Sequence, residues 1–138
     1  MQRSKVRAIV LEDYFNKIVY PMNSQIVAGI QPLQNLGNVS VIAKLCGNPE
    51  IGKAYAKKSI EDGLQKLEQI LEKTSGKYAF GDSITMADVC IVPQVYNAIR
   101  FGVNMDAYPV IKRIDASLQD IDAIKKSHPS QQPDAVNQ

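Results

Sequence analysis

A helix start signal, followed by a strongly apolar segment, constrains the fold of this chain more than any other feature. In residues 81–101, Thr85 and Asp88 have the Thr-x-x-Asp spacing of a capping box. In such a box the hydroxyl accepts a hydrogen bond from the backbone N–H three residues on, while the carboxylate accepts one from the N–H of the capping residue. Ile84 and Val89 flank the box at the positions of a hydrophobic staple. The sequence therefore predicts a helix that begins here, with Thr85 and Asp88 as its structural cap.

The segment after the box predicts a helix that is buried on most of its surface, because its apolar residues surround the helix axis instead of forming one stripe. These residues are Val89, Cys90, Ile91, Val92, Val95, Tyr96 and Ile99. Pro93 lacks a backbone N–H and should bend the helix. Taken alone, these features are typical of any well-capped core helix in an all-helical domain.

Length and charge exclude several classes of protein. At 138 residues the chain has the size of one domain with a real hydrophobic core. Its 16 Lys and Arg against 14 Asp and Glu give a net charge of +2, and no dense basic run indicates nucleic acid as a partner. No apolar run approaches the roughly 18 residues of a membrane span, and charges occupy the start, where a secretory signal would be apolar. We therefore expect a cytoplasmic protein with no nucleic-acid or membrane partner.

The cysteines and the histidine do not predict a catalytic or metal site. Cys46 and Cys90 lack metal-ligand spacing and a matching histidine cluster, so both are interpreted as reduced core thiols of a cytosolic protein. His128 is the only histidine and precedes Pro129, which favours a structural hydrogen bond over catalysis. Residues 128–138 are predicted to form an extended tail.

The rest of the chain also has helical periodicity. Residues 5–19 carry apolar side chains at intervals of three and four, and Pro21 should stop or kink that helix. Residues 50–73 form the clearest amphipathic pattern, and Ser75 and Gly76 should end it. Its apolar positions are Ile60, Leu64, Leu67 and Leu71. Pro109 suits the first position of a last helix, whose apolar face is Val110, Ile111, Ile114, Leu118 and Ile121. The fold class is therefore predicted to be all-α.

Six short motifs together resemble one known family. They are GIQPLQNL at 29–36, TMAD at 85–88, VPQVYNA at 92–98, the pair Arg100-Phe101, AYPVIKRI at 107–114 and HPSQQPDA at 128–135. Their order resembles the C-terminal helical domain of glutathione transferases, and more narrowly the zeta class, also known as maleylacetoacetate isomerase. The similarity runs from about residue 23 to the end, and residues 10–23 are not placed on the family. The resemblance implies a glutathione transferase C-terminal-like helical bundle that spans residues 1–138.

The resemblance also singles out polar residues around the first motif. Residues 25–36 are predicted to form a helix bent at Pro32, and amide side chains on such a helix usually face water. In the family, however, the positions that match Gln31, Asn35, Leu36 and Gly37 border the cleft for glutathione and substrate. Gly37 stands where relatives more often have Ser, so it offers only backbone groups there.

Arg100 is the strongest candidate for a substrate-binding residue. It ends the apolar helix, which could carry the guanidinium to the rim of a cleft, where its planar donors can grip a carboxylate bidentately. The alternative is an exposed arginine that stabilises the C-terminus of its helix. The resemblance implies that Arg100 binds the carboxylate of maleylacetoacetate, a dicarboxylic diketone, or of a small α-haloacid.

The isomerisation that the resemblance implies needs an activated thiol. A glutathione thiolate adds to the cis double bond, the resulting single bond rotates, and the thiolate is expelled to leave the trans product. In the family a Ser-Ser-Cys motif in an N-terminal thioredoxin-like domain activates that thiol, and these 138 residues contain no Ser-x-Cys turn. We therefore expect the substrate-side domain of a homodimeric isomerase of tyrosine and phenylalanine catabolism, inactive without the thioredoxin-like half. The alternative is a stand-alone helical assembly module of the same descent, which would need an exposed apolar patch of several hundred Å².

Overall fold

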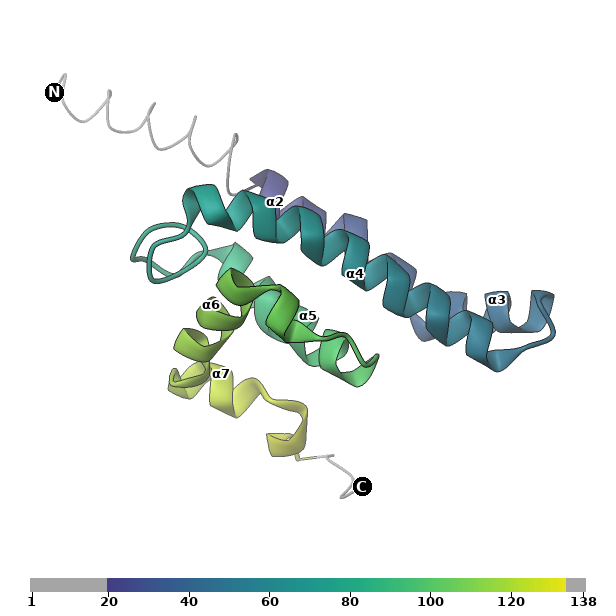
Figure 1. Cartoon of the computed structure of the whole chain (residues 1–138). Coiled ribbons are helices and arrows are strands. Elements are labelled where there is room, and N and C mark those ends of the chain that lie inside the picture. The colour runs from purple at the N-terminus through teal and green to yellow at the C-terminus, as the bar shows by residue number, and fades with distance from the viewer. Residues whose placement is uncertain (1–19, 134–138) are drawn as a thin grey trace, which may run out of the picture.

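The computed structural model describes residues 20–133, and the helix predicted for residues 5–19 lies outside them. Within this range the chain is helical, with no β-strand, which confirms the all-α prediction (Figure 1). The elements are, in order, α2 (Tyr20–Ser24), the π-helix η2 (Gln25–Ile30), the 3₁₀ helix η3 (Gln31–Gln34), α3 (Leu36–Leu45), α4 (Pro49–Thr74), α5 (Met86–Arg100), the 3₁₀ turn η4 (Met105–Ala107), α6 (Pro109–Gln119), α7 (Asp122–Ser127) and the 3₁₀ turn η5 (Pro129–Gln131).

The long helix α4 is the central element of the fold, and its predicted extent is confirmed to within one residue at each end. Asn48 caps it, because its side-chain oxygen accepts a hydrogen bond of 2.9 Å from the N–H of Glu50. The four predicted apolar residues all lie in the core, fully buried: Ile60, Leu64, Leu67 and Leu71. The helix ends at Ser75, as expected.

The capping box at the start of α5 is present, and it reaches further than the sequence indicates. Asp88 is fully buried. One of its carboxylate oxygens accepts from the backbone N–H of Thr85 at 2.7 Å and from the Thr85 hydroxyl at 2.8 Å. The other accepts from the N–H of Ala79 at 2.7 Å. The same side chain therefore caps the helix and fixes the loop that leads into it.

The prediction that α5 is buried on most sides is wrong for one face. Ile91 and Val95 are in the core, but a stripe of apolar residues is exposed. This α5 stripe consists of Met86, Val89, Tyr96 and Ile99, which are 57%, 48%, 44% and 62% exposed. Ile84 and Val89, the expected staple, are both about half exposed. The helix is amphipathic in its packing although its composition is apolar all round.

The segment before α3 is irregular where one bent helix was expected. The chain passes from π-helix to 3₁₀ helix at Gln31, ends that run at Gln34 and starts α3 after Asn35. Pro32 supplies no N–H, so it suits the first turn of the short 3₁₀ helix and not the middle of a long α-helix.

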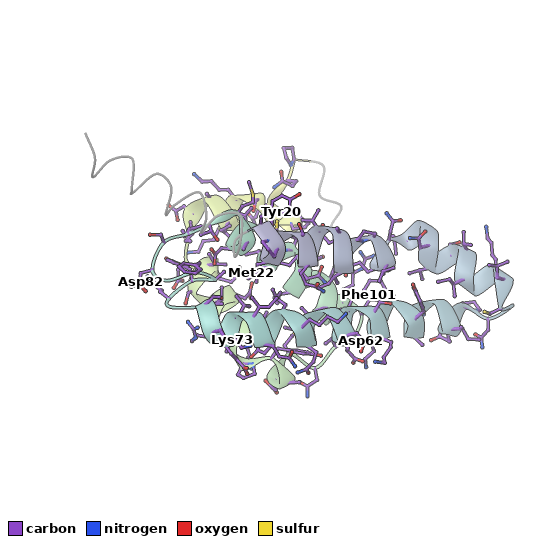
Figure 2. The ribbon with its side chains drawn as sticks, turned by 90° about the horizontal axis from the view of Figure 1, so that it is seen from above. Tyr20, Met22, Asp62, Lys73, Asp82 and Phe101 are labelled. Atoms are coloured by element: carbon purple, nitrogen blue, oxygen red, sulfur yellow. The ribbon has the colours of Figure 1, made fainter. Side chains whose placement is uncertain are left out.

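The core lies where η2, α4, α5 and α6 meet. Met22 points into it and is fully buried, whereas Tyr20 two residues earlier is 64% exposed (Figure 2). α3 and the N-terminal half of α4 extend away from this core as an arm (Figure 1). Cys46 lies at the end of that arm and is exposed, so its assignment to the core is wrong, and Cys90 is half-buried; neither forms a disulfide.

Candidate functional site

The structure brings most of the predicted site residues to one place. An open hollow of about 410 Å³ lies between the η3–α3 junction and the end of α5. It is lined by Gln31, Gln34, Asn35, Leu36, Asn97, Arg100 and Phe101. Phe101, labelled in Figure 2, follows the last residue of α5. Three of the four positions named near the first motif thus share a hollow with Arg100, and Gly37 is not among the lining residues.

The first wall of the hollow is built by the start of α3. Asn35 is the N-cap of this helix, because its side-chain oxygen accepts from the N–H of Gly37 at 2.9 Å. Asn38 secures the same turn by donating to the carbonyl of Pro32 at 2.7 Å. The N–H of Gly37 is therefore already used, whereas the side-chain amide of Gln31 and the NH₂ of Asn35 have no hydrogen-bond partner within residues 20–133.

The second wall is the last turn of α5. Arg100 is exposed, and within residues 20–133 its guanidinium forms no ion pair and no hydrogen bond, including none to the carbonyls that end its own helix. Asn97 lies one turn earlier and is half-buried, and its side-chain amide is likewise unpaired in the described chain. Among the described residues that line the hollow, Arg100 is the only charged one. Within the described part of the chain, the hollow thus contains the unpaired guanidinium of Arg100 beside unpaired side-chain amide groups.

Asn97 is a lining residue that the sequence reasoning missed. Residues three apart on a helix lie on the same face, so its spacing from Arg100 was a usable signal. Asn97 had been noted only as part of the VPQVYNA motif.

A buried pair of amides joins the two walls at their base. The NH₂ of Gln34 donates to the side-chain oxygen of Gln94 at 3.2 Å, and the NH₂ of Gln94 donates to that of Gln34 at 3.0 Å. Gln94 is fully buried and Gln34 is 7% exposed. The amides of residues 25–36 were expected to face water, and the sequence does not reveal the partner of Gln34 because it lies 60 residues away.

The described thiols do not belong to the hollow. Cys46 lies at the end of the arm, and Cys90 does not line the cavity. Burial raises the pKa of the Cys90 thiol, which keeps it protonated and a poor nucleophile at neutral pH. The hollow has the groups for binding anions and amides but holds no activated thiol of its own.

His128 contacts α5 at Tyr96 and is not among the residues that line the hollow. Its Nδ1 lies 2.7 Å from the Ser130 hydroxyl, and its ring meets that of Tyr96 edge to face at 5.6 Å. Both rings line a shallow apolar groove of about 320 Å³ between α5 and residues 124–129. These contacts agree with the structural interpretation of this histidine.

Residues 20–133 contain neither a candidate metal site nor a candidate membrane span. No group of three or more His, Cys, Asp or Glu side chains in this range is arranged to hold a metal ion. None of the helices there combines the length and the apolar character that crossing a bilayer requires.

Solved structures with the same fold are related to glutathione chemistry. The maleylacetoacetate isomerase of Anaeromyxobacter dehalogenans 2CP-1, with dicarboxyethyl glutathione and citrate bound in its active site, superposes with a TM-score of 0.82 at 32% identity. That similarity covers 86% of this chain and 54% of the relative. The holo structure of a maleyl pyruvate isomerase, a bacterial zeta-class glutathione-S-transferase, gives a TM-score of 0.81 at 32% identity over 86% of this chain and 57% of the relative.

Sequence relatives agree with the structural ones. The maleylacetoacetate isomerase of Rattus norvegicus is 44% identical over 117 residues, which are 85% of this chain and 52% of the relative. Probable maleylacetoacetate isomerase 2 of Drosophila melanogaster is 42% identical over 133 residues, which are 96% of this chain and 51% of the relative. The chain spans about half the length of the curated relatives it matches. Residues 40–127 match the family model of the glutathione S-transferase C-terminal domain, and the chain therefore belongs to that family.

Proposed function

We propose that this chain is the substrate-side helical domain of a glutathione-dependent maleylacetoacetate cis–trans isomerase. The observation that carries the proposal is the hollow, where an unpaired Arg100 faces the amides of Gln31 and Asn35 from a distant part of the sequence. Relatives that are 44% and 42% identical are a maleylacetoacetate isomerase and a probable one. In this proposal residues 1–138 form one domain, and α2 to η5 are its described part.

In this proposal Arg100 binds a carboxylate of the substrate. Its fork of N–H donors matches a carboxylate in geometry and charge, and none of the described residues that line the hollow is an acid that competes for it. Its position on the final turn of α5 leaves the guanidinium exposed to an incoming ligand. A dicarboxylate such as maleylacetoacetate suits this site, and a small α-haloacid offers the same carboxylate.

Gln31, Asn35, Leu36 and Gly37 are the proposed border of the glutathione site. Glutathione carries two carboxylates and two amides, which match the free amide groups of Gln31 and Asn35. Leu36 is 61% exposed and can supply an apolar contact, while Gly37 acts through Asn35, whose cap it completes. When bound, glutathione supplies the thiol nucleophile, and this chain's residues orient the substrate beside it.

The thiol must be activated by residues outside the described hollow. Cys90 has a raised pKa, and the one cationic group among the described residues that line the hollow, Arg100, is assigned to the substrate carboxylate, so no cationic or hydroxyl group remains there to hold a thiolate. We propose that a thioredoxin-like domain supplies that activation and that it covers part of the α5 stripe, which ends beside Arg100. The assembled protein is then a cytoplasmic homodimer that serves tyrosine and phenylalanine catabolism.

The same stripe favours a second candidate function. Four apolar side chains between 44% and 62% exposed on one helix are typical of a surface that binds another protein. An assembly module of glutathione transferase descent would use this stripe and would not need the hollow. Binding of small ligands in the hollow therefore separates the two candidates.

The test combines turnover with complementation. The 138-residue chain is assayed with maleylacetoacetate and glutathione alone, and again after fusion behind the part of the rat relative that this chain does not match, which we propose is the thioredoxin-like half. We expect no turnover alone and clear turnover in the fusion, with Arg100→Ala lowering kcat/KM by roughly 100-fold because a charge-assisted contact of about 2–3 kcal/mol is lost. Lys66→Ala removes an exposed cation from α4 and serves as the matched control with unchanged kcat/KM. A fusion that turns over equally well with Arg100→Ala would exclude the proposed role.

A further inference from the structure

We infer that Gln34 and Gln94 are positioning residues that set the spacing between the two walls of the hollow. The inference deepens the proposed function, because a carboxylate held by Arg100 meets Gln31 and Asn35 only if the walls keep a fixed separation. Neither glutamine needs to touch the ligand for this role. The pair acts through the residues next to it on each wall.

Each glutamine lies close in the sequence to the lining residues of one wall. Gln34 is the last residue of η3 and immediately precedes Asn35, the N-cap of α3. Gln94 lies on α5, one turn before Asn97 and six residues before Arg100. The two hydrogen bonds, at 3.2 and 3.0 Å, therefore connect the element that carries one set of ligand groups to the element that carries the other.

The Gln34–Gln94 pair is the only polar link between the two walls within residues 20–133. In the described chain no other hydrogen bond and no ion pair joins residues 31–37 to α5. Asn35 and Asn38 bond only within their own turn. Apolar packing can hold two elements together, but it tolerates small shifts, whereas a reciprocal amide pair has a defined length and direction.

Both glutamines are buried. A buried amide is costly unless it is hydrogen-bonded, so each glutamine is stable here only while the other faces it. Any slide of α5 along η3 would leave two buried amides unsatisfied at once. The pair thus favours one relative position of η3 and α5 over slightly shifted ones, as expected of a buried polar network.

The first measurement needs no ligand. Spin labels are placed at Leu33→Cys on η3 and Ile99→Cys on α5, both exposed and both outside the lining of the hollow, in a chain whose Cys46 and Cys90 are replaced by Ser and Ala. Pulsed electron paramagnetic resonance then reports the distance between the walls. We expect one narrow distribution with the native glutamines and a broader or shifted one in Gln34→Met/Gln94→Met, which keeps the side-chain volumes but removes both hydrogen bonds.

Two further variants keep the test decisive. Gln94→Glu can still accept from Gln34 but cannot donate to it, so it should give an intermediate distribution even if the double variant unfolds. Tyr108→Phe removes a hydrogen bond of 3.2 Å to the carbonyl of Glu61, outside the hollow, and controls for a general loss of stability. An unchanged distribution in both glutamine variants, or the same broadening in Tyr108→Phe, would overturn the inference.

The second measurement adds a ligand. Maleate, a cis dicarboxylate, is titrated into the full chain and followed by NMR at the side chains of Asn35, Asn97 and Arg100. We expect Gln34→Met/Gln94→Met to raise the Kd about tenfold, and Arg100→Ala to lose most of its own effect in that background, because Arg100 then no longer faces a fixed opposite wall. Additive effects of the two changes would count against positioning. If the distance distribution changes as expected but the native chain binds no maleate, the spacing inference stands and the proposed function fails.

Discussion

Gly63 on α4 lies directly against Ile30 at the end of η2. A Cβ atom built on this glycine would be 2.3 Å from Cγ1 of Ile30, so no side chain fits between the two helical segments. The contact brings η2 onto α4 and so determines where η3, with Gln31 and Gln34, leaves the core. The position of the first wall of the hollow depends on this close approach.

Substituting Gly63 should therefore destabilise the fold. Gly63→Ala gains up to about 1 kcal/mol of helix propensity, but overpacking against Ile30 should cost about 2–4 kcal/mol, for a net loss of roughly 1–3 kcal/mol in urea unfolding. Gly29→Ala is the matched control, because its Cβ would meet only the mobile end of the Gln25 side chain at 3.1 Å. Equal stability of the two variants would contradict this account of the η2–α4 contact.

Glu68 should be a major stabiliser of α6. It is 4% exposed, and its two carboxylate oxygens accept from the N–H groups of Val110 and Ile111 at 2.7 and 3.0 Å, at the positive end of the α6 dipole. Glu68→Ala leaves both N–H groups unpaired and should lower the free energy of unfolding by about 2–4 kcal/mol. Glu72→Ala, an exposed change one turn later on α4, should cost less than about 0.5 kcal/mol. Thermal unfolding followed by circular dichroism compares them.

Asp115 should make the free energy of unfolding fall as pH rises, which is opposite to the effect of most carboxylates. Burial raises its pKa in the folded chain, although Gln119 donates a hydrogen bond of 3.1 Å to it. Because the unfolded chain ionises first, stability is lost as pH rises from the unfolded pKa to the folded one, and the loss persists at neutral pH. Asp115→Asn should therefore raise the melting temperature slightly at pH 7 and not at pH 3. The reverse pattern would show that the charged form is favoured in the fold.

The two cysteines should react with a thiol reagent at different rates. Cys46 is exposed at the end of the arm, whereas Cys90 is half-buried and burial raises the pKa of its thiol. Since the thiolate is the reactive form, a disulfide reagent at pH 8 should modify Cys46 at least about tenfold faster than Cys90. Cys46→Ser should remove the fast phase and Cys90→Ala the slow one. A single phase shared by both would contradict the burial of Cys90.

Much of the local structure was predictable because its causes lie within a few residues. The Thr85–Asp88 cap is formed by residues three apart, and Pro109 starts α6 through its fixed backbone angle. The apolar spacing of residues 50–73 fixed the face that α4 buries. The same reasoning predicted that Arg100 ends the helix that Thr85 caps, which is one wall of the hollow.

The remaining features were decided by tertiary structure, because their partners are distant in the chain. Asn97 and Arg100 share a hollow with Gln31 only because η2 packs on α5 and η3 packs on α4. Gln34 would face water on an isolated helix but is buried by Gln94, 60 residues away, and Glu68 becomes a cap only because α6 begins beside it, 42 residues on. The apolar residues of α5 lie on all sides of the helix, and the packing of the neighbouring elements determines which face is exposed. Local sequence determines helices and their caps through short-range hydrogen bonds, whereas the register between helices, and with it the site, depends on which buried polar groups find partners when the core closes.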